Sequence, residues 1–173
     1  MKSSEVLAFL PLLIYGFAIA ELFRQWKRII DFKHLFLPYT LFTLVLTEIA
    51  LYNVFLYSKL VPEISGLTYF NYMIYLLPPF LFMITVYVFT PEKEDDTKEY
   101  FIAKMPIFFF LISLFIATHF IFEYQENMGV KVGRIIGIIL IMSAGISRKI
   151  WLTYLVFALW LIVLIFRGFV VSA

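Results

Sequence analysis

Apolar segments long enough to cross a lipid bilayer follow one another along this chain, with short charged connections between them. Residues 67–90 contain no charged side chain at all, and a helix needs about 20 apolar residues to cross the hydrocarbon core. The chain of 173 residues is 63% hydrophobic and 15% charged, whereas soluble domains are about 45–50% apolar and about 25% charged. A soluble fold of this length could not bury so many Phe, Leu and Ile side chains, so we expect an all-α transmembrane helical bundle.

Length and charge divide the sequence into about six predicted transmembrane helices. Their approximate ranges are 6–23, 35–57, 67–90, 100–122, 130–147 and 150–166. The fifth is short between Arg134 and Arg148, so it spans only if flanking basic side chains reach back to the interface. Otherwise it is re-entrant and the count falls to five. Neither a repeat nor a linker interrupts the chain, which predicts one integral membrane domain over residues 1–173.

The Lys and Arg residues predict an orientation, because short cytoplasmic loops collect basic side chains. With six spans and an outer N-terminus, the inner loops contain Arg24, Lys27, Arg28, Lys33, Lys93, Lys98, Lys104, Arg148 and Lys149. The outer side contains Lys2, Lys59, Lys131, Arg134 and Arg167. This distribution predicts both termini outside, and we expect the protein to be integral to a cell (plasma) membrane.

Glu48 is an ionisable residue close to the centre of the second predicted helix. It lies about 20 Å along a helix that needs about 30 Å to cross. A lipid-exposed carboxylate at that depth costs about 2.5–3.5 kcal/mol, so we expect Glu48 to face the bundle interior. There it is either a site for a proton or cation, or a neutral carboxylic acid that bonds a neighbouring helix.

Pro78 and Pro79 interrupt the third predicted helix at nearly the same depth as Glu48. Proline has no N–H, and its ring clashes with the carbonyl four residues back, so the carbonyls of Ile74 and Tyr75 lose their helical donors. Transporters build substrate and ion sites from broken helices near the membrane midplane. Membrane helices also tolerate proline as a simple kink, and both interpretations stay open.

Asn53, Asn71 and His119 come from three predicted helices but lie at one depth, toward the predicted outer face. If they face one another, they form a polar vestibule above Glu48, where His119 would relay protons because imidazole titrates near neutrality. The alternative is that each makes a separate hydrogen bond near the interface. The candidate ion or substrate site therefore comprises Glu48, Asn53, Asn71, Pro78, Pro79 and His119.

Two further groups predict packing and lipid contacts. Gly133, Gly137 and Gly145 lie on one broad face of the fifth helix, a pattern typical of close helix approach within a bundle or between copies of a chain. Basic residues in the first inner loop attract anionic lipid headgroups. These residues are Arg24, Lys27, Arg28 and Lys33.

The sequence contains no motif that indicates catalysis, a cofactor or a metal. The absence of cysteine and the presence of two histidines leave no metal-binding spacing. A serine elbow is missing, and no basic patch with interleaved aromatic residues predicts nucleic acid.

We therefore expect a small transporter or an ion or proton channel subunit centred on Glu48, with the lipid bilayer as its surroundings. It would act alone, as a homo-oligomer or with another membrane protein, and its polar residues would converge on one cavity. The alternative is a non-catalytic structural or sensory subunit of a larger membrane complex, which predicts a packed bundle with an exposed flat face. An enzyme that acts on lipid is the third hypothesis.

Overall fold

The structure is a computed structural model that describes residues 3–30, 35–64, 67–91, 96–122 and 128–170. These residues form seven α-helices and contain no strand, which confirms the expected all-α bundle. The helices are α1 Ser3–Ile30, α2 Leu37–Ile64, α3 Tyr69–Tyr75, α4 Leu77–Phe89, α5 Thr97–Phe122, α6 Met128–Ser147 and α7 Ile150–Val170.

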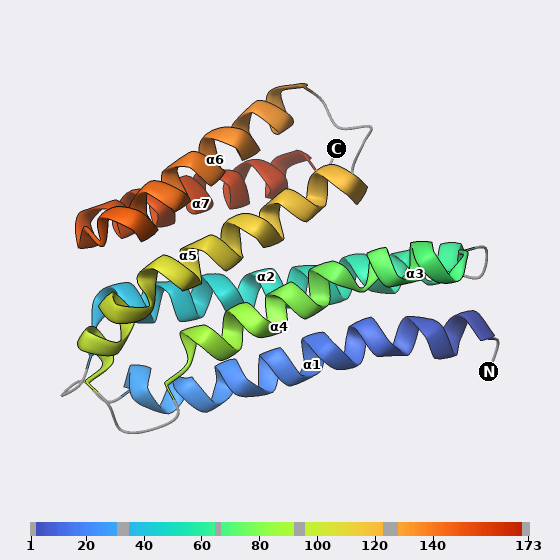
Figure 1. The fold of residues 1–173 in the computed structure, drawn as a ribbon, viewed down its shortest axis with the longest axis horizontal. Helices are drawn as coiled ribbons and strands as arrows, with labels where there is room; N and C mark the ends of the chain where they lie inside the picture. The colour runs from blue at the N-terminus through green and yellow to red at the C-terminus, as the bar shows by residue number, and fades with distance from the viewer. Residues whose placement is uncertain (1–2, 31–34, 65–66, 92–95, 123–127, 171–173) are drawn as a thin grey trace.

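The helices run side by side along the long axis of the molecule, with α3 and α4 in line as one broken rod (Figure 1). α1 packs on α2 and α4, α4 packs on α5, α5 on α6, α6 on α7, and α7 returns to α2. The rods therefore form a closed ring, and α2 also touches α5 across the middle. α1 begins and α7 ends at the same end of this bundle (Figure 1).

Four helical stretches in the described part of the chain are long and apolar enough to cross a membrane. They are Leu37–Lys59, Tyr69–Phe89, Thr97–Ile121 and Met128–Ser147. α6 is one continuous helix of 20 residues, which favours a spanning helix over a re-entrant one. α7 contains a shorter apolar stretch, Ile150–Ile165. That α1 and α7 also cross the bilayer stays a prediction.

Local signals account for the ends of two helices. The Asp96 side chain caps α5, because its Oδ1 accepts the backbone N–H of Lys98 at 2.8 Å and of Glu99 at 3.4 Å. Arg148 has a φ of 51° in the connection from α6 to α7, and its N–H donates to the Ala144 carbonyl at 3.1 Å. This left-handed residue ends α6 and lets α7 turn back along it.

Aromatic rings fill the core between α1, α2, α4 and α5. Tyr39 stacks on Phe89 with ring centroids 4.6 Å apart and an interplanar angle of 6°. Phe42 meets Phe109 edge-on at 5.3 Å, and Phe108 lies 4.9 Å from Phe89. All five rings are buried, and such aromatic pairs add about 0.5–1.5 kcal/mol beyond their burial. This side of the helix bundle is held together by packed aromatic side chains.

Candidate functional site

Glu48 lies at the centre of the apolar span Leu37–Lys59, equally far from its two ends, and its side chain is half-buried. The neighbours at the same angular position on α2 are exposed: Leu44 at 42%, Leu51 at 52% and Phe55 at 50%. Residues spaced by four, three and four positions share one helix face. We call Leu44, Glu48, Leu51 and Phe55 the Glu48 face.

The Glu48 face points away from the aromatic core, which differs from the expectation that Glu48 faces the bundle interior. The polar residues that α2 buries are instead Thr43, Thr47 and Asn53. Thr43 donates its hydroxyl to the Tyr39 carbonyl at 2.9 Å, and Thr47 donates to the Thr43 carbonyl at 2.8 Å. Glu48 also interacts with a group of its own chain, and exposed apolar side chains lie next to it along the same helix face.

The helix break at Pro78 and Pro79 is closed by a neighbouring helix. Both prolines lie in the first turn of α4, where the fixed φ of proline suits the start of a helix. The carbonyl oxygen of Tyr75, four residues before Pro79, accepts the hydroxyl of Tyr57 at 2.9 Å. Tyr57 is a buried residue of α2, so α2 supplies the donor that the proline removes.

The same arrangement recurs in α1. Pro11 lies inside this helix and removes the helical donor of the Leu7 carbonyl. The hydroxyl of Tyr72, from α3, donates to this carbonyl oxygen at 2.8 Å. Two tyrosines therefore tie the short helix α3 to α1 and α2. Neither hydroxyl bond was predicted from the sequence, although each proline marks a carbonyl four residues earlier that needs an outside donor.

Tyr15 lies beside this pair of bonds but makes no comparable one. Its ring is fully buried, and its centroid lies 5.5 Å from the ring of Tyr57 and 5.5 Å from that of Phe82. Its hydroxyl has no hydrogen-bond partner among the described residues. A buried hydroxyl without a partner is unfavourable, so Tyr15 stabilises the break through ring packing alone.

The three residues of the predicted vestibule have different surroundings. Asn53 is buried, and its Nδ2 donates to a carbonyl one turn back in α2 at 2.8 Å. Asn71 is exposed in the first turn of α3, where its backbone N–H donates to Thr68 Oγ1 at 3.3 Å. His119 is half-buried, with Nδ1 3.1 Å from the carbonyl oxygen of Phe115. Each of these contacts is local in sequence, and the vestibule stays a prediction.

The three glycines of α6 differ in what faces them. A Cβ on Gly145 would lie 2.9 Å from the Phe109 Cβ and 3.3 Å from the Met105 carbonyl oxygen of α5. A Cβ on Gly137 would make an ordinary 3.8 Å contact with a side chain of α7, and at Gly133 no described atom would lie within 4 Å. Close helix approach within the bundle therefore depends on Gly145.

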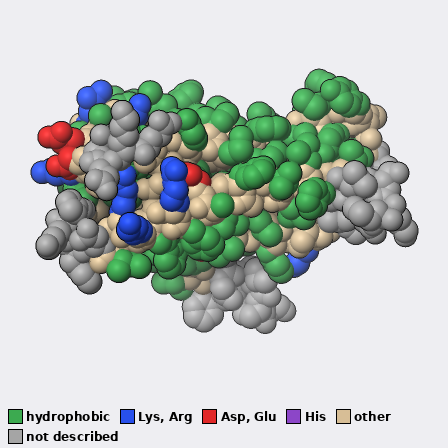
Figure 2. All heavy atoms as spheres, turned by 90° about the horizontal axis from the view of Figure 1, so that it is seen from below, with side chains coloured by type: hydrophobic (Ala, Val, Ile, Leu, Met, Phe, Trp, Pro, Cys, Tyr) green, Lys and Arg blue, Asp and Glu red, His purple; other side chains and the backbone are tan. Residues whose placement is uncertain are grey.

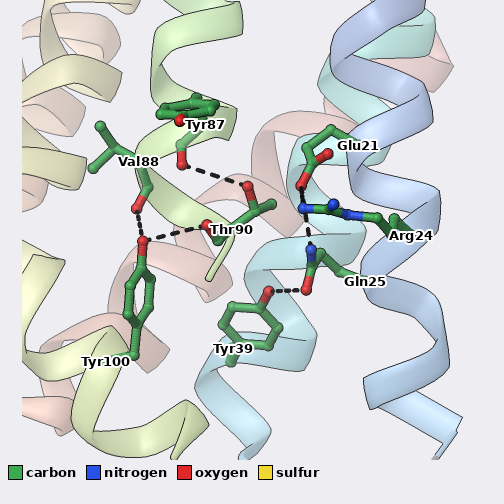
Figure 3. A network of polar contacts seen from close by, with 8 residues as sticks. All are labelled: Glu21, Arg24, Gln25, Tyr39, Tyr87, Val88, Thr90 and Tyr100. Carbon is green, nitrogen blue, oxygen red and sulfur yellow. Dashed lines mark hydrogen bonds and ion pairs between the residues drawn. The ribbon is translucent and has the colours of Figure 1, made fainter. Parts of the chain in front are cut away.

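α1 ends, and α6 turns into α7, at the end of the bundle opposite the start of α1 (Figure 1). We call this end the basic end. A chain of polar side chains ties α1 to α2 there (Figure 3). Glu21 Oε1 accepts from Arg24 Nη2 at 2.6 Å and from Gln25 Nε2 at 3.3 Å, and the Tyr39 hydroxyl donates to Gln25 Oε1 at 3.1 Å. The amide of Gln25 is buried, whereas 61% of the Arg24 side chain is exposed. The network runs from the core to the surface.

A second set of bonds in Figure 3 joins α4 to α5. The Tyr100 hydroxyl lies 2.9 Å from the Val88 carbonyl and 3.3 Å from the Thr90 carbonyl. The last carbonyls of a helix have no intrahelical donor. A tyrosine hydroxyl is therefore a donor for unpaired carbonyls at this end of the bundle as well.

Charged side chains gather at the basic end on the face of the molecule that Figure 2 shows. At the basic end Arg24 and Lys27 are exposed and Arg28 is half-buried. Their contact with anionic headgroups stays a prediction. Lys33, the fourth residue of the predicted headgroup cluster, lies outside the described residues.

These features define a helical, multi-pass membrane protein with a carboxylate on the outward side of one span. In the described ranges, His, Cys, Asp and Glu residues form no group of three that could hold a metal ion. No protein family, curated protein or solved structure matches the chain.

Proposed function

We propose that the protein is a non-catalytic structural or sensory subunit that associates with another membrane protein in a larger complex. The observation that carries this proposal is the Glu48 face, which combines a central carboxylate with exposed apolar side chains. A carboxylate facing lipid at the bilayer centre costs about 2.5–3.5 kcal/mol. A protein partner over this face would reduce that cost.

The packing beside the helix break supports the same proposal. The rings of Tyr15, Tyr57 and Phe82 are buried against one another there. A solute passing between α1, α2 and α4 at this depth would have to separate these rings and lose their contacts, each worth about 0.5–1.5 kcal/mol. A supporting role requires no such opening.

The chain contains no cysteine, so a single introduced cysteine gives one defined crosslinking position. A photo-crosslinker on Leu51→Cys, within the Glu48 face, should join the protein to a second polypeptide in its native membrane. The matched control is Phe110→Cys on α5, because Phe110 is 51% exposed and Leu51 is 52% exposed. Equal protein crosslinking from both positions, or none from Leu51→Cys, would contradict the proposal.

A second function is favoured by the depth of the same carboxylate. Glu48 lies at the centre of the apolar span Leu37–Lys59, and the bundle also contains the broken helix α3–α4, a feature that transporters use to build ion sites. In this alternative Glu48 binds a proton or cation in a transporter or channel subunit, working alone or as a homo-oligomer. In both cases we propose a cell membrane with both termini outside.

Proteoliposome flux separates the two functions. If Glu48 is a permeation site, pH-dependent proton or cation flux will be present in the native chain and lost in Glu48→Gln. If the chain is a supporting subunit, both proteins will be silent across the same pH range while the Leu51→Cys crosslink is still formed in the native membrane.

A further inference from the structure

We infer that the Glu48 face binds a transmembrane helix that carries a Lys or Arg near the centre of its own span. This inference rests on the proposed subunit function and adds the chemistry of the partner. It starts from the position of Glu48, the one charged residue of α2 before Lys59.

The shape of the Glu48 face fits a helix lying along it. From Leu44 to Phe55 it extends over about 16 Å of α2, at a rise of about 1.5 Å per residue. Apolar side chains lie on both sides of the carboxylate, with Leu44 one turn before it and Leu51 and Phe55 after it. A partner helix would pack apolar residues above and below a central polar group.

The carboxylate selects a basic partner over an apolar or amide one. Charged groups within a membrane pair with one another, and a hydrogen bond between two ionised groups is about twice as strong as a neutral one. Interhelical bonds between neutral polar residues average only about 0.6 kcal/mol. Because Glu48 also interacts within its own chain, a partner cation would add to those contacts.

A second copy of this chain fits the Glu48 face less well. Symmetric pairing would bring two Glu48 carboxylates together, and like charges repel. The nearest basic residue on α2 is Lys59, about 16 Å further along the helix. Lys59 Nζ lies 4.2 Å from the centroid of the Phe55 ring, at the end of the Glu48 face and not beside the carboxylate.

The test uses the full chain in phosphatidylcholine vesicles with a fluorophore on Tyr69→Cys, an 80% exposed position of α3 outside the Glu48 face. Acceptor-labelled transmembrane peptides of Leu and Ala carry Lys, Gln or Leu at their centre. We expect energy transfer to the Lys peptide at a concentration at least about tenfold lower than to the Leu peptide, equivalent to about 1.4 kcal/mol.

Glu48→Gln should abolish the preference for the Lys peptide. The matched control Glu99→Gln removes an exposed carboxylate from the first turn of α5 and should keep the preference. Equal binding of all three peptides, or a preference that survives in Glu48→Gln, would overturn the inference. Self-association in peptide-free vesicles that Glu48→Gln abolishes would overturn it too, since the face would then belong to a second copy.

Failure of this inference is distinguishable from failure of the proposed function. If the peptides show no charge preference while Leu51→Cys still crosslinks in the native membrane, the partner is not basic but the subunit function stands. If the crosslink is also absent, both fall.

Discussion

Two regions of the helix bundle are packed by different kinds of contact. In the apolar span Tyr69–Phe89, which lies among α1, α2 and α5, 50% of the residues are buried, whereas in the equally apolar span Met128–Ser147 only 22% are buried. The first region is joined by aromatic rings and tyrosine hydroxyls. The second is joined to α5 by a close backbone approach at Gly145. Hydropathy therefore indicates which helices enter a membrane but not how many neighbours each one acquires.

Gly145→Leu should have the largest effect, because it attacks the contact that holds α6 on α5. Its Cβ would lie 2.9 Å from the Phe109 Cβ and 3.3 Å from a backbone oxygen, a clash that side-chain rotation does not relieve. We expect a loss of about 3 kcal/mol in the free energy of unfolding, the upper end for overpacking. Titration with SDS in mixed micelles measures it.

Gly133→Leu is the matched control for that substitution, since no described atom lies within 4 Å of its Cβ position. Leucine has a higher helix propensity than glycine by about 0.8 kcal/mol, so stability should be unchanged or slightly higher. A similar loss of unfolding free energy in Gly145→Leu and Gly133→Leu would contradict the contrast between the two regions. The stability of α6 would then not depend on the close contact at Gly145.

Tyr57→Phe should have the next largest effect, because it removes the donor from the carbonyl that Pro79 frees. A buried carbonyl left without its partner costs about 1–3 kcal/mol, and we expect about 2 kcal/mol less unfolding free energy. Tyr15→Phe is the internal control: the Tyr15 hydroxyl has no hydrogen-bond partner among the described residues, so its loss should be neutral or stabilising. Equal losses in the two variants would show that the hydroxyl bond does not close the break.

Tyr39→Phe tests the junction of α1 and α2 at the basic end. It removes the hydroxyl that donates to the buried Gln25 amide at 3.1 Å while keeping the ring stacked on Phe89. We expect a loss of about 1 kcal/mol in unfolding free energy. Tyr154→Phe, at a 39% exposed position of α7, should leave stability unchanged. A larger loss of unfolding free energy in Tyr154→Phe than in Tyr39→Phe would contradict this expectation.

Arg24→Gln should have the smallest effect and sharpens the comparison at the surface. The Arg24–Glu21 pair is short, at 2.6 Å, but 61% of the Arg24 side chain is exposed. Exposed ion pairs contribute at most about 1 kcal/mol and are screened by salt. We expect less than about 0.5 kcal/mol at low ionic strength and no difference in 1 M salt. A salt-independent loss would indicate that Arg24 acts through packing.

The helices and the position of the break were predictable because they depend on length, charge and proline chemistry. The expected break at Pro78 and Pro79 lies where α3 gives way to α4, and Glu48 lies midway between the ends of the apolar span Leu37–Lys59. Both features depend only on where a residue lies along its own helix, which can be counted from the sequence.

The rotation of α2 was not predictable in the same way. In a membrane, apolar residues cover the lipid side and the core side alike, so Leu44 and Leu46 look identical in sequence although one is exposed and the other buried. The hydroxyl donors Tyr57 and Tyr72 depend on which helices become neighbours. A partial signal existed, because Thr43 and Thr47 lie on a different face from Glu48 and are among the residues that α2 buries.

The most direct test of the account is Glu48→Leu, followed by two measurements on the same protein: unfolding free energy in micelles, and the Leu51→Cys crosslink in the native membrane. If Glu48 serves a docking face on the outside of α2, the crosslink will be lost while the free energy of unfolding changes little, because the loss of the Glu48 contacts within its own chain is offset by the removal of a costly carboxylate from an apolar face. A marked loss of stability with the crosslink intact would contradict the account, because Glu48 would then support the interior of the bundle.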